Sequence, residues 1–131
     1  CVRRLGLDDR VTFQGVVGQS SLARQYHFSD LFVLASHYEG YGMALTEALA
    51  HGVPIIATGA GATVKTVPSR AGLLVPPGDV AALTSALGRF FGEPRLRRKL
   101  KAGARAFRLR QRSWDVVIHE MADEVRSWVA T

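Results

Sequence analysis

The stretch MALTEALAHGVPIIA, residues 43–57, places a helix directly before a strand. Residues Met43–Ala50 are strong helix formers, and their apolar members share one face of a 3.6-residue repeat. Gly52 is the kind of residue at which such a helix stops. Val53–Ala57 follows as a continuous apolar run. Because this run does not alternate with polar residues, it predicts a strand buried on both faces, as in a parallel sheet.

Helices and strands alternate on both sides of this stretch. Before it, the sequence predicts a strand over Val11–Gln14, which ends at Gly15. A helix capped by Ser20 or Ser21 and ending near Phe28 follows, and then a buried strand over Leu31–Ala35. After it come the strand Gly72–Val75, a helix capped by Asp79 and ending near Phe91, a basic helix opened by Pro94, and an amphipathic helix capped by Ser113. This order predicts a Rossmann-like, doubly wound α/β fold, in which helices cover both faces of a parallel sheet.

The composition is that of one globular domain. Of the 131 residues, 47% are hydrophobic, which is a larger share than a disordered chain carries. Cys1 is the single cysteine, so an intramolecular disulfide and a cysteine-based metal site are excluded, and a reducing cytoplasm is the expected location. The longest apolar runs are far shorter than the ~20 residues of a membrane-spanning helix, and the N-terminus has no apolar signal region.

One segment supplies the positive net charge of +6. Residues 95–112 hold nine of the 17 basic residues and no acidic residue. The simpler interpretation is a solvated helix face. The alternative is a surface, from Arg95 to Arg112, that contacts the inner face of an anionic membrane or an acidic acceptor. Nucleic acid is not an expected partner, because the sequence has neither a recognition helix nor an aromatic platform.

Residues 36–47, SHYEGYGMALTE, have the chemistry of an anion site. They follow a predicted strand and open a helix, whose first amides lack internal partners and lie at the positive end of the helix dipole. Gly40 and Gly42 would let a diphosphate approach the main chain. Glu39 and Glu47 flank the site, and since phosphate would repel them, they would accept hydrogen bonds from sugar hydroxyls. Without the flanking residues, both glutamates would be read as ordinary surface residues.

The same segment resembles a family signature. It has the pattern Ser-x-x-Glu-Gly-aromatic-Gly followed by a second Glu, with residues 40–46 between the two glutamates. This pattern resembles the nucleotide-sugar signature of glycosyltransferase family 4, whose enzymes have the two-domain GT-B architecture. Further blocks resemble that family in the same order: Val11–Gly15, Asp30–Leu34, Glu47–Ala57, Gly72–Asp79 and Ser113-Trp114.

The resemblance implies transfer of a sugar, with retention of configuration, from a nucleoside diphosphate sugar to an acceptor. Glu39 would be the catalytic residue that contacts the transferred sugar, and Glu47 would hold the ribose hydroxyls. The implied donor-binding residues are Gly15, Val16, Gly40, Tyr41, Gly42, Met43, Ala44, Leu45 and Glu47, with the amides from Gly42 onward on the diphosphate and the first two residues beside the base. The family needs no metal or other cofactor, because positive side chains and the helix dipole stabilise the leaving diphosphate.

The sequence departs from the family pattern after the strand Val53–Ala57. The family has a Gly-Gly-x-x-Glu loop there, whereas the matching stretch Gly61–Lys65 ends in a lysine. Lys65 could contact a phosphate, mark a degenerate site or be a surface residue. The resemblance implies that the arginine and lysine that the family directs at the diphosphate would belong to a segment before residue 1 of this chain, as would the acceptor domain.

Residues 1–131 are therefore predicted to be a single C-terminal, nucleotide-sugar-binding domain of a GT-B glycosyltransferase, with the N-terminal acceptor domain absent. The first residue is Cys rather than Met, which indicates a piece of a longer polypeptide. The isolated chain is then expected to be inactive. The alternative function is that of a non-catalytic remnant or interaction domain that uses its basic segment.

Overall fold

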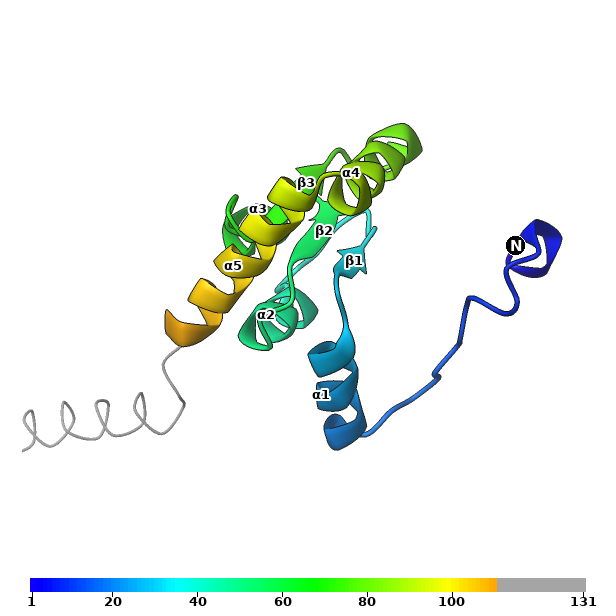
Figure 1. The fold of residues 1–131 in the computed structure, drawn as a ribbon, viewed down its shortest axis with the longest axis horizontal. Coiled ribbons are helices and arrows are strands. Elements are labelled where there is room, and N and C mark those ends of the chain that lie inside the picture. The colour runs from blue at the N-terminus through cyan, green and yellow to red at the C-terminus, as the bar shows by residue number, and fades with distance from the viewer. Residues whose placement is uncertain (111–131) are drawn as a thin grey trace, which may run out of the picture.

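The computed structural model describes residues 1–110, which contain a three-stranded parallel sheet with helices around it (Figure 1). In chain order the elements are the 3-10 helix η1 (Arg3–Leu5), α1 (Gln19–Phe28), β1 (Phe32–Leu34), α2 (Met43–Ala50), β2 (Ile55–Thr58), α3 (Thr63–Thr66), β3 (Gly72–Val75), α4 (Val80–Gly92) and α5 (Pro94–Arg110). The Rossmann-like α/β class predicted from the sequence is confirmed.

The central strand is β2, which pairs in parallel with β1 on one side and with β3 on the other. Ile55 is in register with both Phe32 and Gly72. Every residue of β2 is buried, so the prediction of a strand covered on both faces is confirmed, although the strand begins two residues after Val53. Gly72 lets β3 come close, since a Cβ there would lie 2.7 Å from the carbonyl oxygen of Ile55.

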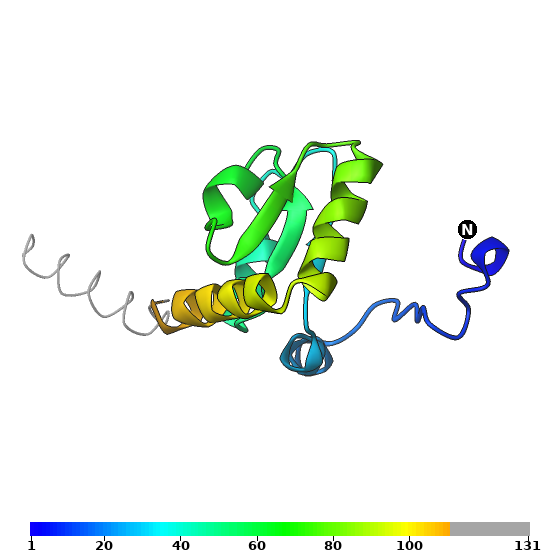
Figure 2. The same ribbon diagram turned by 45° about the horizontal axis from the view of Figure 1, so that its top comes forward.

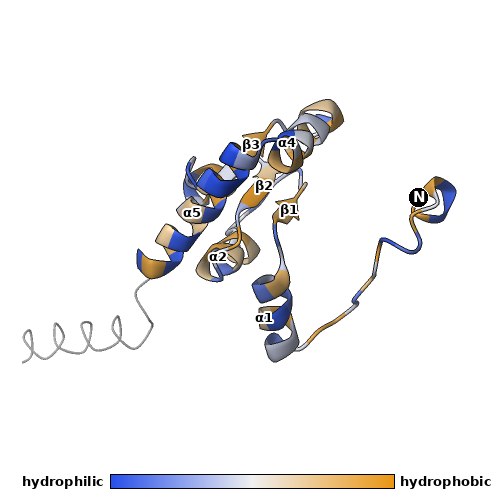
Figure 3. Cartoon of the chain, viewed as in Figure 1, coloured by the Kyte–Doolittle hydropathy of each residue, from blue (hydrophilic) through white to orange (hydrophobic). Residues whose placement is uncertain are grey.

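Helices cover both faces of the sheet because successive side chains of β2 point to opposite sides. Ile55 belongs to a buried cluster that includes Leu45 and Leu49 of α2. Ile56 belongs to a second cluster that includes Phe90 of α4. In Figure 3, β2 has the hydrophobic colouring expected of a strand between two apolar layers. The predicted coverage of both faces is confirmed.

Helix α5 crosses the sheet at the end where the strands begin (Figure 2). Ahead of β1, Asp30 Oδ1 accepts a hydrogen bond of 2.5 Å from Lys101 Nζ. Ahead of β2, Gly52 packs against the side chains of the helix. Ahead of β3, the carbonyl of Arg70 lies so close to Gly103 that a Cβ at position 103 would be 2.0 Å from it. One helix therefore contacts the start of every strand.

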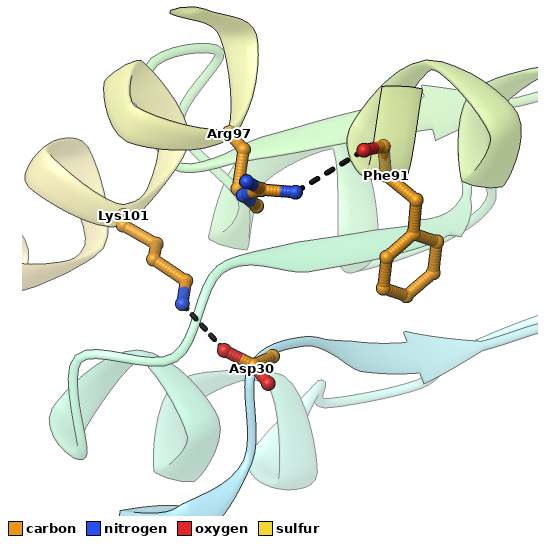
Figure 4. Close-up of polar contacts among 4 residues, drawn as sticks. All are labelled: Asp30, Phe91, Arg97 and Lys101. Atoms are coloured by element: carbon orange, nitrogen blue, oxygen red, sulfur yellow. Dashed lines mark hydrogen bonds and ion pairs between the residues drawn. The ribbon is translucent and has the colours of Figure 1, made fainter. Parts of the chain in front are cut away.

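Apolar burial holds α5 in place, together with two polar contacts that Figure 4 shows. Leu100 packs in the cluster of Ile56, and Ala104 packs in the cluster of Ile55. Arg97 Nη1 donates a 3.1 Å hydrogen bond to the carbonyl of Phe91 in α4. The hydrogen bond from Lys101, followed by the charge of that lysine, lowers the pKa of Asp30. Because this carboxylate is largely exposed, the pair contributes at most about 1 kcal/mol, and burial is the stronger anchor.

Three predicted helices are confirmed. α2 has the predicted bounds, and Pro94 opens α5. Asp79 caps α4, because its Oδ1 accepts a hydrogen bond of 2.8 Å from the amide of Ala82. That helix ends at Gly92, one residue beyond the predicted end. The predicted helix capped by Ser113 lies outside the described residues.

Two local predictions are corrected. Neither Ser20 nor Ser21 caps α1, because the helix begins at Gln19 after Gly18 and has no side-chain cap; both serines lie in its first turn. β1 is shorter than predicted and is not fully buried, since Val33 is 42% exposed. The reason is that β1 is at the edge of the sheet, with one neighbouring strand among the described residues.

The predicted strand Val11–Gln14 is wrong. These residues form no regular element, and Phe13 is 82% exposed. Figure 1 shows this segment running away from the sheet toward η1. A strand needs a neighbour to pair its main-chain groups, and nothing within residues 1–110 pairs with this segment. Its alternating pattern is therefore compatible with a strand but not sufficient to form one.

The contact between α5 and the start of β3 predicts different effects for two glycine substitutions. Gly103→Ala should lower the free energy of unfolding by about 1–3 kcal/mol, because the new Cβ would force α5 and the Arg70 main chain apart. Gly88→Ala in α4 is the matched control, since a Cβ there meets nothing within 4 Å and should raise stability by up to about 1 kcal/mol. Urea unfolding followed by circular dichroism measures both variants. Equal midpoints for the two would contradict the described packing.

Candidate functional site

The loops after β1 and β2 meet at the carboxyl edge of the sheet. The amide of Ala62 donates a 2.8 Å hydrogen bond to the carbonyl of Glu39. Gly61 has a φ of 60°, and a Cβ there would lie 2.2 Å from the same carbonyl oxygen. The hydroxyl of Thr58 donates a hydrogen bond to the carbonyl of Ser36. This close contact requires a glycine at position 61 and fixes the loop that contains both predicted anion-site glycines.

The first turn of α2 has main-chain amides without partners inside the helix. Thr46 is the first residue whose amide donates within the helix, to the carbonyl of Gly42 at 2.9 Å. The amides of Met43, Ala44 and Leu45 precede it, at the positive end of the helix dipole. The side chain of Met43 is 78% exposed and that of Leu45 is buried in the core. The helix start is thus open on one side and anchored on the other.

Gly42 fixes where this helix begins. It has a left-handed φ of 70°, which favours glycine, and it is the N-cap of α2. A Cβ there would lie 3.2 Å from Thr66 Oγ1 of α3 and 3.3 Å from Cδ1 of Leu45. The short helix α3 therefore packs against the start of α2.

Glu39 is bound to the helix start that it was predicted to flank. Its Oε1 accepts a 3.0 Å hydrogen bond from the amide of Gly42. A carboxylate is favoured at this position because it faces the positive end of the α2 dipole. One of the amides predicted to face a diphosphate is therefore already paired, and the other oxygen of Glu39 has no hydrogen-bond partner among the described residues.

Glu47 lies one helical turn after Met43 and is exposed. Its Oε2 accepts a long hydrogen bond of 3.4 Å from the hydroxyl of Tyr26 in α1. The ring of Tyr26 stacks on His51 at the end of α2, with centroids 5.1 Å apart. Burial, and then the negative charge of Glu47, raise the pKa of Tyr26 above its ordinary value of 10.0.

The structure brings only part of the predicted set together. Gly40, Tyr41, Met43 and Ala44 are exposed and Glu39 is half-buried, whereas Gly42 and Leu45 are buried. Lys65 is exposed on the neighbouring α3. Gly15 and Val16 lie outside regular secondary structure, in the segment that joins η1 to α1. This segment runs away from the sheet (Figure 1). Val16 is fully exposed, and a Cβ at Gly15 would meet nothing within 4 Å. A role for these two residues beside a base stays a prediction.

Tyr26 and Thr66 were not predicted from the sequence as site residues. Tyr26 follows Leu22 by four residues on the inner face of α1, a spacing that predicts packing but not a hydroxyl directed at Glu47. Thr66 has no sequence signal, since its position beside Gly42 depends on the path of the loop before α3.

Within residues 1–110, no group of three His, Cys, Asp or Glu side chains is placed to hold a metal ion. No helix in that range combines the length and the apolar character needed to cross a membrane.

The fold and the site define the class of this protein: a Rossmann-like α/β domain with an open helix start, two acids and a glycine-containing loop at the carboxyl edge of a parallel sheet. Comparison with known proteins gives the family. Residues 1–93 match the family described as glycosyl transferases group 1, and the chain belongs to this family. The resemblance found in the sequence is confirmed at this level.

Two curated relatives illustrate the match. D-inositol 3-phosphate glycosyltransferase of Thermomonospora curvata is 32% identical over 120 residues, which cover 91% of this chain and 28% of the relative. Mannosylfructose-phosphate synthase of Agrobacterium fabrum is 38% identical over 96 residues, which cover 72% of this chain and 21% of the relative. The chain thus spans less than a third of the length of these relatives.

Solved structures of GT-B glycosyltransferases share the fold. Sucrose-phosphate synthase from Thermosynechococcus elongatus has a TM-score of 0.79 and 34% identity, covering 98% of this chain and 33% of that one. The C-terminal domain of LpcC, a glycosyl transferase group 1 family protein from Francisella tularensis, has a TM-score of 0.72 and 30% identity, covering 81% of this chain and 55% of that one. HepE of Anabaena, solved in complex with UDP, has a TM-score of 0.79 and 23% identity, covering 96% of this chain and 35% of that one. At this identity the similarity shows the fold alone.

The contact between Tyr26 and Glu47 predicts a late ionisation of the Tyr26 hydroxyl. Since burial and a neighbouring carboxylate favour the neutral phenol, the pKa of Tyr26 lies above its ordinary value of 10.0, and the folded chain should lose stability as the pH rises above that value. Ultraviolet absorbance of tyrosinate follows this titration. Tyr26→Phe should remove the component with the raised pKa, the exposed-site control Tyr41→Phe should keep it, and Glu47→Gln should move it to lower pH. If the component lost in Tyr26→Phe titrates at or below pH 10.0, the contact is contradicted.

Proposed function

We propose that this chain is the donor-binding domain of a glycosyltransferase and that it holds a nucleoside diphosphate sugar at the start of α2. One observation carries the proposal: the amides of Met43, Ala44 and Leu45 have no partner inside the helix and lie between two carboxylates at the carboxyl edge of the sheet. Ligands of open α/β sheets bind at this edge. Membership of the glycosyltransferase family supports the choice of ligand.

The three parts of the donor would meet different groups. The diphosphate would lie against the unpaired α2 amides, where the helix dipole favours an anion. Glu47 would accept hydrogen bonds from the ribose hydroxyls, in competition with its long bond from Tyr26. Glu39 would keep its bond to Gly42 through Oε1 and offer Oε2 to a hydroxyl of the sugar.

The chemistry of this arrangement is stabilisation of a leaving group. Breaking the bond between the sugar and the diphosphate leaves negative charge on the diphosphate, directly opposite the positive end of α2. Lys65 on α3 would add a positive side chain at the same edge. No metal ion or other cofactor is part of the proposal, and transfer with retention of configuration would take place in the whole enzyme, with the acceptor bound by a further domain.

The site is tested by titrating the chain with UDP and with GDP in the presence of a chelator, while amide chemical shifts are followed by NMR. UDP is the first probe because HepE, which shares the fold, was solved with UDP. The amides of Met43 to Leu45 should shift, because they would donate to the diphosphate. If no nucleoside diphosphate shifts these amides, the chain is a non-catalytic domain of the family and the proposal is wrong.

The ribose contact is tested by Glu47→Gln. Loss of a hydrogen bond to a charged group should weaken UDP binding by about tenfold, and the variant should bind the 2′,3′-dideoxy analogue as well as the unsubstituted chain does. Glu93→Gln, at the junction of α4 and α5, is the control and should leave both affinities unchanged. Equal weakening toward both nucleotides would show that Glu47 acts on the fold and not on the ribose.

A further inference from the structure

Helix α5 turns a strongly cationic face to solvent. Its inner stripe packs on the sheet through Leu96, Leu100, Gly103, Ala104 and Phe107. Outside this stripe the helix has six exposed basic residues, here called the cationic face: Arg95, Arg98, Lys99, Arg105, Arg108 and Arg110. Two of them, Arg105 and Arg108, also contact Gly52 with the stems of their side chains. The two other basic residues of the described helix, Arg97 and Lys101, are half-buried. They make the polar contacts with the Phe91 carbonyl and with Asp30 (Figure 4).

The cationic face has no compensating acid in the described structure. None of its six residues forms an ion pair within residues 1–110, and α5 contains no acidic residue. Several of these cations are three or four residues apart, as are Arg95 and Lys99, and like charges at that spacing destabilise a helix. Solvated helix faces commonly mix the two signs, so a single-sign face suits an anionic partner.

Exposed apolar groups lie among these cations. Leu109 is 85% exposed and lines a shallow hollow with Ala102 and Ala106, with Arg98 and Arg105 at its rim. Figure 3 shows hydrophilic colouring along α5 that is interrupted by apolar patches.

A second hollow, of about 340 Å³, lies between α1 and α5. Arg105 and Arg108 line it from α5, and Phe28 lines it from the end of α1. Phe28 is 76% exposed. The cationic face is therefore continuous with two exposed apolar side chains from different helices.

We propose that this face docks on an anionic lipid bilayer, with the six cations at the headgroups and with Leu109 and Phe28 inserted beside them. A bilayer offers both a plane of negative charge and an apolar layer beneath it, which match the two chemistries of the face. Duplex nucleic acid offers phosphates but no apolar layer for the leucine.

The position of α5 leaves the donor site free. The helix crosses the sheet where the strands begin, as shown by its contacts with Asp30, Gly52 and Arg70. The α2 start lies where the strands end. A bilayer on the cationic face would therefore not cover the proposed donor site, and the docking is independent of the proposed function.

The proposal is tested by co-sedimentation of the 131-residue chain with vesicles of phosphatidylcholine alone or mixed with phosphatidylglycerol. Binding should require phosphatidylglycerol and should weaken as salt is added, because exposed charges are screened. Neutralising three cations in Arg95→Gln/Arg98→Gln/Lys99→Gln should weaken binding on the order of 100-fold, at about fivefold for each cation. Arg3→Gln/Arg4→Gln/Arg10→Gln changes the net charge equally at exposed sites far from α5 and should bind like the unsubstituted chain.

The apolar contribution is tested by Leu109→Ser, with Leu5→Ser as an exposed control outside the face. Leu109→Ser should weaken vesicle binding several-fold without changing its salt dependence, and Leu5→Ser should not. Circular dichroism checks that every variant is folded. Three results with vesicles would overturn the proposal: equal binding to neutral and anionic vesicles, equal loss of vesicle binding in the two triple variants, or unchanged vesicle binding of Leu109→Ser. Binding to duplex DNA without binding to vesicles would also overturn it.

Discussion

Close packing around β2 is the constraint on which the other elements depend. This strand has a neighbour on each edge and a helical layer on each face, so its main-chain groups must all be paired within the sheet. Ile55 and Ile56 point to opposite layers, which separates the core into two clusters. Close approach of β3 depends on the absence of a side chain at Gly72. The helices pack on the two faces of this strand and also on one another, since α5 contacts both α2 and α4.

The same pairing creates the candidate site. Parallel strands end at one edge, so the loop after β1 and the loop after β2 must share that space. They meet at the carbonyl of Glu39, and the lack of a Cβ at Gly61 makes the contact sterically allowed. The carboxylate of Glu39 then reaches the amide of Gly42, which ties the start of α2 to the loop. An acid that the family resemblance assigns to the sugar is thus also an N-terminal capping group in this chain.

Most of the fold could be predicted from local patterns. α2, β2 and α4 follow from periodicity, a stop glycine and a capping aspartate, all of which act within a few residues. The strand predicted at Val11–Gln14 was wrong because pairing depends on a distant partner that the pattern does not contain. The bond of Glu39 to Gly42 and that of Tyr26 to Glu47 were not predicted, since the first depends on a left-handed backbone and the second on how α1 packs against α2.

The path of α5 also bears on how the chain folds during synthesis. Its Leu100 and Ala104 belong to different clusters, and both come late in the sequence. Neither cluster is complete until this helix has left the ribosome. Until then, the N-terminal ends of β1, β2 and β3 are not covered by α5. Native contacts between residues as distant as Asp30 and Lys101 close long loops, which slows folding. An emerging chain therefore exposes apolar strand surface until α5 is available, and exposed surface of this kind is prone to aggregate.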